Sequence, residues 1–145
     1  MIYTDLTKKA MRIAFDAHKE QADKSGLPYI FHPFHLAEQM TDEISVCVAL
    51  LHDVVEDSPL TFGDLANHGI PLEVIKALVL LTHDESVSYS DYVKNIKDSG
   101  NQCAIDVKLA DLRHNSDLSR LDGFDEKAIA RIKKYRDAIA VLERR

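Results

Sequence analysis

The sequence predicts an all-α protein of about seven or eight helices, folded as one domain over residues 1–145. Apolar residues recur at spacings of three and four along most of the chain, which is the period of an amphipathic helix. Residues that start and stop helices (Asp, Thr or Pro before each apolar run and Gly after several of them) recur between these runs. A length of 145 residues is close to the commonest size of a single domain and is sufficient for a buried core.

The first helix is expected from Thr4 to about Lys24 because its apolar residues share one face. Ser25-Gly26 should end it, since glycine is the usual residue beyond a helix C-terminus. A short extended link follows, and Pro33 fits the first position of a second helix that runs to about Met40.

The third helix is expected from Glu43 to about Glu56, with Asp42 as its cap and Pro59 preventing its continuation. Nearly every side of this helix is apolar, so it should lie at the centre of the protein. The other helices are predicted over residues 61–69, 71–83, 90–97, 102–118 and 125–143.

Composition excludes several classes of protein. Hydrophobic residues make up 46% and charged residues 29% of the chain, as in ordinary globular proteins. No apolar run reaches the roughly 20 residues that span a bilayer, and the N-terminus lacks the layout of a signal peptide. We therefore expect a cytoplasmic protein with no membrane partner. The formal net charge of −6 argues against nucleic-acid binding but leaves room for a small anionic ligand held by local cations.

Four ionisable groups stand directly after the apolar run ALL: His52, Asp53, Glu56 and Asp57. On one helix these residues would be neighbours at spacings of three and four. Carboxylates and an imidazole that converge there would repel or become protonated unless a cation lay between them. Such ligands suit Mn²⁺, Fe²⁺, Zn²⁺ or Mg²⁺. The alternative is a solvated helix end that carries ordinary charges.

A second polar cluster lies in VKLADLRHNSDL, where Lys108, Asp111 and Asn115 share one face of the predicted helix. An aspartate on an inward-facing helix needs a partner, and a metal ion is one candidate. The alternative is an ion pair of Asp111 with Lys108 or Arg113.

His32 is held at a helix entrance by Pro33, which restricts the backbone of the residue before it. His35 lies three residues further on and is an alternative ligand. The other histidines have no comparable context and are treated as ordinary residues: His18, His68, His83 and His114.

Three segments carry a resemblance to a known family: KSGLPYIFHP, ALLHDVVEDS and VKLADLRHN. Together they resemble the HD-domain metal-dependent phosphohydrolases, and more specifically the hydrolase domain of the stringent-response alarmone enzymes. In size the chain is similar to the single-domain small alarmone hydrolases. The resemblance extends to about Leu121 and implies an HD-type helical bundle.

The resemblance also implies roles for individual residues. The metal ligands would be His32, His52, Asp53 and Asp111, with Mn²⁺ as the usual ion and Zn²⁺ or Fe²⁺ as alternatives. Glu56 and Asp57 would orient or activate the attacking water. Lys24 and Asn115 would contact the substrate, and we group Lys108 with them. The implied reaction removes the 3′-pyrophosphate of (p)ppGpp to give GDP or GTP.

At two positions the sequence departs from the family pattern, and these departures leave the identity of the nucleotide substrate open. Asp23 stands where the family usually has an arginine that contacts the purine, and Arg113 is displaced by one position along its helix. An HD phosphohydrolase acting on ppApp, NADPH or a nucleoside monophosphate is therefore an alternative, as is a non-catalytic nucleotide-binding module. An exposed apolar stripe on the last helix would suit a homodimer.

Overall fold

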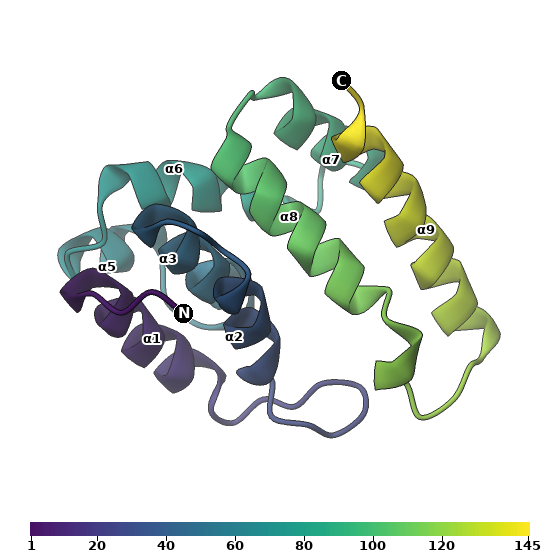
Figure 1. Ribbon diagram of the computed structural model, residues 1–145, viewed down its shortest axis with the longest axis horizontal. Helices are drawn as coiled ribbons and strands as arrows, with labels where there is room; N and C mark the ends of the chain where they lie inside the picture. Colours follow the sequence, from purple (N-terminus) through teal and green to yellow (C-terminus); the bar gives the residue numbers. More distant parts are fainter.

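The computed structural model describes residues 1–145, and it contains only helices and connecting loops (Figure 1). The predicted all-α fold is confirmed. The elements are α1 (Asp5–His18), α2 (Phe31–Glu38), α3 (Glu43–Leu51), α4 (Val54–Asp57), α5 (Phe62–Asn67), α6 (Leu72–Leu81), α7 (Tyr89–Asp98), α8 (Gln102–Asn115), the 3₁₀ turn η1 (Leu118–Arg120) and α9 (Glu126–Glu143).

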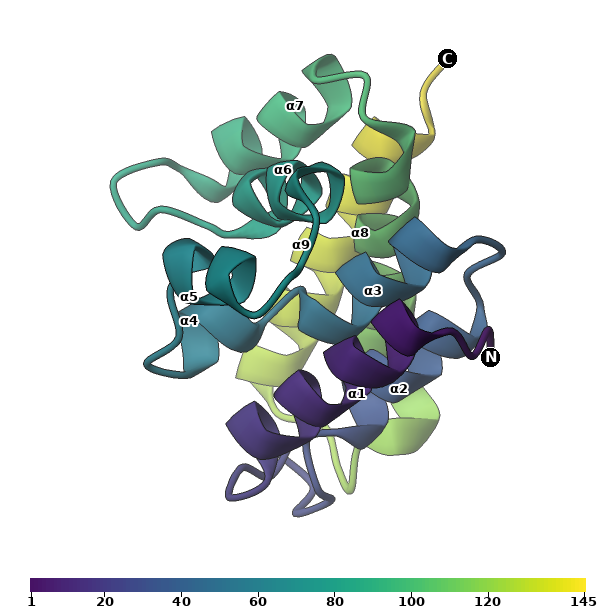
Figure 2. The same cartoon turned by 90° about the vertical axis from the view of Figure 1, so that its left-hand side faces the viewer.

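Helix α3 is the central element, as its apolar sequence predicted. Seven of its nine residues are buried, from Ser45 to Leu51. It packs against α1, α2, α6 and α8, so its C-terminal end lies inside the protein. Figure 2 shows α3 between the N-terminal helices and the α8–α9 pair.

Helices α8 and α9 run side by side and form one flank of the molecule (Figure 1). Helix α7 also packs on α9. Ile132 and Leu142 of α9 are buried against these neighbours, and only Ile129 of the predicted stripe is strongly exposed, at 60%. The expectation of an exposed stripe is therefore wrong, and a homodimer remains a prediction without that support. No helix is both long enough and apolar enough to cross a bilayer.

The first helix is shorter than the sequence predicted, because it ends at His18 rather than near Lys24. The Gln21 side chain folds back and donates to the carbonyl oxygen of Ala17 and to that of Asp57. This amide therefore satisfies a free carbonyl at the helix end and ties it to α4. Gly26, expected as the helix stop, instead adopts a left-handed conformation (φ 82°) in the following loop.

The predicted third helix is two helices. It breaks at His52-Asp53, and Asp53 adopts φ −108° and ψ 1°, a conformation common in turns and active sites. The His52 ring donates through Nδ1 to the carbonyl oxygen of Ala49 at 2.7 Å, satisfying a group at the end of α3. The neighbouring positions assumed from a continuous helix therefore do not apply across this break.

The buried position of α3 yields a stability prediction. Leu50→Ala should lower the free energy of unfolding by about 2–5 kcal/mol, because Leu50 is 1% exposed and its truncation leaves a cavity. Urea denaturation would measure the change. Val79→Ala on α6 is a suitable control, since Val79 is 51% exposed and should lose much less. Equal losses in the two variants would contradict the central position of α3.

Candidate metal centre and its two cavities

At the break between α3 and α4, the side chains of His52 and Asp53 point towards α2 and α8. Because an amide carbonyl can only accept a hydrogen bond, the proton of His52 must lie on Nδ1, which faces Ala49. The other ring nitrogen, Nε2, faces the protein interior and the carboxylates of Asp53 and Asp111. The His52 side chain is 5% exposed.

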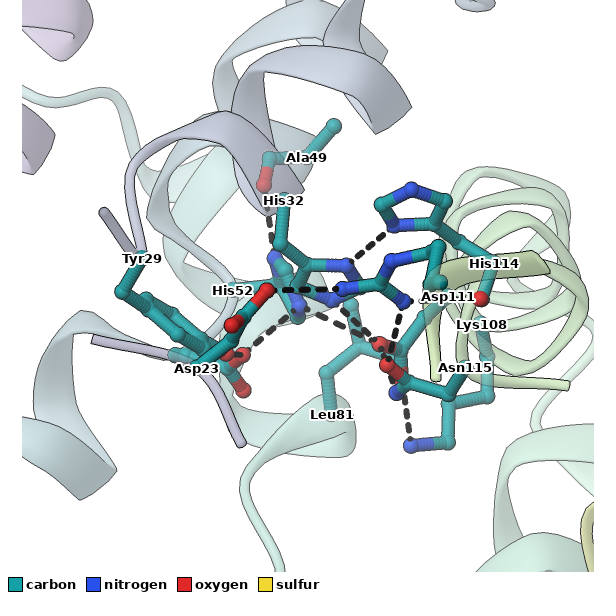
Figure 3. A network of polar contacts seen from close by, with 12 residues as sticks. Asp23, Tyr29, His32, Ala49, His52, Leu81, Lys108, Asp111, His114 and Asn115 are labelled. Atoms are coloured by element: carbon teal, nitrogen blue, oxygen red, sulfur yellow. Dashed lines mark hydrogen bonds and ion pairs between the residues drawn. The ribbon is translucent and has the colours of Figure 1, made fainter. Parts of the chain in front are cut away.

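Four side chains from three segments meet at this point, and Figure 3 labels three of them, His32, His52 and Asp111. Nε2 of His52 lies 2.9 Å from Oδ2 of Asp53 and 3.5 Å from Oδ1 of Asp111. Nε2 of His32, from α2, lies 2.8 Å from the same Oδ1 of Asp111. Ligand atoms of His32, His52 and Asp53 all lie within 4.8 Å of one another. The structure thus brings together all four residues that the sequence grouped as metal ligands.

The donor set fits a divalent cation. Nε2 of His52 is buried and makes no hydrogen bond, although carboxylate oxygens lie close to it. A lone pair that faces carboxylates is unfavourable unless a proton or a metal ion lies between them. Two imidazole nitrogens and two carboxylate oxygens are ligands that Mn²⁺, Fe²⁺ and Zn²⁺ accept.

The pKa values of the clustered residues show how strongly these buried groups interact. Burial alone would lower the pKa of His52, but Asp53 and Asp111 outweigh it and raise that pKa well above its ordinary value. Burial opposes ionisation of Asp53 as well, yet His52 lowers its pKa to about 2. Both aspartates are therefore ionised at neutral pH and require a positive charge beside them.

Lys108 supplies part of that charge. Its Nζ donates to Oδ2 of Asp111 at 2.8 Å, while Oδ1 of the same carboxylate faces the two histidines. Asn115, one turn further along α8, donates through Nδ2 to Oδ1 at 3.1 Å. The expected ion pair of Asp111 with Lys108 is present alongside the cluster. Arg113 points elsewhere and pairs with Glu143 of α9.

Glu56 and Asp57 occupy different surroundings. Glu56 accepts a hydrogen bond from the backbone N–H of His83 and lines a cavity beside the cluster. Partial desolvation raises its pKa, which makes the carboxylate a stronger base. The side chain of Asp57 is exposed and lines neither of the two cavities next to the cluster, although its backbone carbonyl binds Gln21.

Two cavities open on either side of the cluster. The first, which we call the Glu56 cavity, has a volume of about 280 Å³, and the second, the Lys24 cavity, about 320 Å³. Asn115 and Tyr135 border both. His52, Asp53 and Asp111 face the Glu56 cavity, and His32 faces the Lys24 cavity. A ligand could therefore extend through the cluster from one cavity to the other.

The charged lining of the Lys24 cavity comprises three cations, Lys24, Arg120 and Arg131, and two carboxylates, Asp23 and Asp117. Arg120, from η1, donates to the carbonyl oxygen of His114 at 2.7 Å and lies 3.6 Å from a carboxylate oxygen of Asp23. Asp23 thus faces a guanidinium group that another segment provides. Sequence reasoning did not select Arg120 or Arg131, because neither lies in one of the three motifs.

Comparison with known proteins supports the interpretation of these motifs. The chain is 33% identical over 143 residues to the GTP pyrophosphokinase of Myxococcus xanthus, covering 88% of this chain. It is 45% identical over 62 residues to the bifunctional (p)ppGpp synthase/hydrolase SpoT of Escherichia coli, covering 40% of this chain. The chain spans only 19% and 9% of these relatives' lengths. No family model matches the sequence.

A solved structure of a metazoan SpoT ortholog, described as hydrolysing ppGpp, has the same fold. The TM-score is 0.77 at 23% identity, and the match covers 99% of this chain and 88% of that one. The chain resembles an HD-type (p)ppGpp hydrolase domain. The resemblance expected from the three motifs is confirmed.

In this HD-type fold, two aromatic residues that sequence reasoning passed over contact the proposed ligands. Nδ1 of His114 lies 2.7 Å from Nδ1 of His32, so one ring donates a proton and the other accepts it. Burial and the charge of Arg120 lower the pKa of His114 to about 4, which keeps it neutral. The hydroxyl of Tyr29 donates to Asp53. The only sequence signal was that each residue lies within a motif.

His114 should therefore support metal binding. If His32 binds a cation through Nε2, its Nδ1–H must find an acceptor, and His114 provides one. His114→Phe keeps an aromatic ring but removes the acceptor, and we expect Mn²⁺ affinity to fall by about 10–100-fold. Isothermal titration calorimetry would measure it.

His35→Ala is the matched control for this measurement. His35 is exposed and stacks on His114, with ring centroids 4.1 Å apart. It forms no hydrogen bond to a member of the cluster, so its loss should leave Mn²⁺ affinity nearly unchanged. Unaltered affinity in His114→Phe would exclude the supporting role of His114.

Proposed function

We propose that residues 1–145 form one metal-dependent phosphohydrolase domain that removes the 3′-pyrophosphate of (p)ppGpp, giving GDP or GTP. The observation that carries the proposal is the convergence of His32, His52, Asp53 and Asp111 between two cavities, with a free carboxylate in one cavity and cations in the other. The curated relatives named as (p)ppGpp hydrolases supply the substrate class.

The four clustered residues would hold the metal ion, for which we propose Mn²⁺, with Zn²⁺ or Fe²⁺ as alternatives. Two imidazoles and two carboxylates leave coordination positions open on an ion that prefers six ligands. A divalent ion there would lower the pKa of a water molecule and polarise a phosphoryl oxygen.

Glu56 is our proposed general base. It borders the same cavity as His52, Asp53 and Asp111, but it is not part of the cluster. Its carboxylate is therefore free to take a proton from the attacking water, and the His83 backbone N–H holds it in place. Asp57 lies further out, and we propose that it acts through its negative charge near Glu56.

The substrate would lie across the cluster. Lys24, Arg120 and Arg131 give the Lys24 cavity the positive charge that phosphates require. Asn115 borders both cavities and already donates to Asp111. We therefore assign Lys24 and Asn115 to substrate binding, and Lys108 to stabilising both Asp111 and the phosphate next to it.

A second candidate is an HD phosphohydrolase acting on ppApp, NADPH or a nucleoside monophosphate. Asp23 favours this alternative, since it adds a carboxylate to the Lys24 cavity. Arg120 offsets that charge and offers a planar guanidinium group, on which either purine could stack. The base that is preferred therefore requires a direct test.

Replacing Glu56 should reduce turnover strongly but should leave metal binding unchanged. Glu56→Gln keeps the shape of the side chain but cannot accept the proton, so we expect the rate constant to fall at least about 100-fold. Metal analysis of the purified variant should show unchanged Mn²⁺ content. Asp53→Ala should lose both properties. A Glu56→Gln enzyme with full activity would remove Glu56 from the mechanism.

A substrate panel would test the proposed reaction itself. With Mn²⁺ present, ppGpp should yield GDP and pyrophosphate, whereas ppApp, NADPH and nucleoside monophosphates should react more slowly. Turnover of another compound while ppGpp remains intact would establish the second candidate. Binding of ppGpp without turnover of any compound would indicate a non-catalytic nucleotide-binding module.

A further inference from the structure

Tyr89, one of the residues that line the Glu56 cavity, carries a buried polar group without a partner. The hydroxyl oxygen of Tyr89, at the start of α7, is inaccessible to solvent and makes no hydrogen bond. A buried hydroxyl without a partner is costly and uncommon. Burial raises the pKa of Tyr89, so the hydroxyl keeps its proton and is able to donate.

A cation without an ion-pair partner lies over the ring of Tyr89. Nζ of Lys134, on α9, lies 4.2 Å from the centre of the Tyr89 ring. No carboxylate lies within ion-pair distance of Lys134, whereas the adjacent Lys133 pairs with Asp137 at 3.0 Å. Lys108 also lines this cavity, but its ammonium group already binds Asp111. Of these two lysines in the cavity, Lys134 is therefore the one without a carboxylate partner.

From these contacts we propose that Tyr89 and Lys134 form a subsite for the outer phosphate of the diphosphate group that the enzyme removes. The inference rests on the proposed function and adds to it. It assigns the nucleoside to the Lys24 cavity and the diphosphate to the Glu56 cavity.

The geometry of the displacement supports placing the nucleoside and the diphosphate in separate cavities. The water oxygen bonds to the phosphorus attached to the ribose 3′ oxygen, Glu56 takes the water proton, and the P–O3′ bond breaks. The electron pair stays on the 3′ oxygen, which takes a proton from solvent, and free diphosphate is released. Attacking and leaving oxygens lie on opposite sides of the phosphorus. Because Glu56 fixes the water in its own cavity, the nucleoside departs on the opposite side.

The remaining phosphate must then lie where space and positive charge are available. The nucleoside occupies the Lys24 cavity, and the cluster faces the inner phosphate. The Glu56 cavity, at about 280 Å³, is lined by both Tyr89 and Lys134. Hydroxyl and ammonium donors are common partners of phosphate oxygens. Helices α7 and α9, which carry them, pack directly on each other.

Inorganic pyrophosphate and orthophosphate are the probes that test this subsite. In protein saturated with Mn²⁺, Lys134→Met should weaken pyrophosphate binding about tenfold, the usual effect of losing one charge-assisted hydrogen bond. Orthophosphate, which reaches only the inner position, should bind unchanged. Calorimetry measures both without any need for turnover. Tyr89→Phe should weaken pyrophosphate binding several-fold and leave the fold intact.

Lys133→Met is the matched control, because Lys133 is exposed, adjacent in sequence and paired with Asp137. It should bind both probes as the unaltered protein does. Equal weakening of pyrophosphate and orthophosphate in Lys134→Met, or no weakening of either, would overturn the subsite.

The same assay separates the subsite from the proposed function. If ppGpp is hydrolysed while pyrophosphate binding is indifferent to Lys134, the reaction stands and the subsite is wrong. If ppGpp is not hydrolysed but Lys134→Met selectively weakens pyrophosphate binding, the subsite stands and the enzyme acts on a different diphosphate ester.

Discussion

The site depends on one electrostatic constraint, namely that two carboxylates and two imidazole nitrogens are held together inside the protein. The hydrogen bond from Nδ1 of His52 to Ala49 directs the other ring nitrogen, Nε2, towards Asp53 and Asp111. The side chains of His52 and Asp111 are only 5% and 8% exposed, so water screens these charges only in part. Lys108 supplies one positive charge against two aspartates, and a bound cation would balance the remainder.

The arrangement of the helices explains how the cluster forms. Helix α3 is buried on all sides, and its end lies deep enough for His52 and Asp53 to face α2 and α8. The break after Leu51 turns the backbone, so that α4 carries Glu56 past the cluster and into a cavity. A continuous helix would have kept these groups on one face. The break therefore separates the residues that would hold the metal from the residue that would act as base.

The proposed function rests on the division of space around the cluster. One cavity is lined by Glu56 and a lysine without an ion-pair partner, and the other by three cations and the carboxylates of Asp23 and Asp117. A phosphate ester with charge on both sides of the reacting bond would match this asymmetry. Asp23 and Arg120 face each other in the second cavity. If the nucleoside binds there, base preference should depend on this pair rather than on the proposed metal ligands.

The sequence by itself determined the all-α class and the central position of residues 43–51, because local spacing carries that information. The grouping of His32, His52, Asp53 and Asp111 was implied by the resemblance of three motifs to a known family, since spacing within each motif cannot bring distant segments together. The sequence did not determine the end of α1 or the break at His52-Asp53, since both depend on partners distant in sequence, such as Asp57 for Gln21. It also did not single out His114, Arg120, Tyr89 or Lys134. Their roles come from contacts between α2, α7, α8, η1 and α9, and only tertiary packing decides which of these surfaces meet.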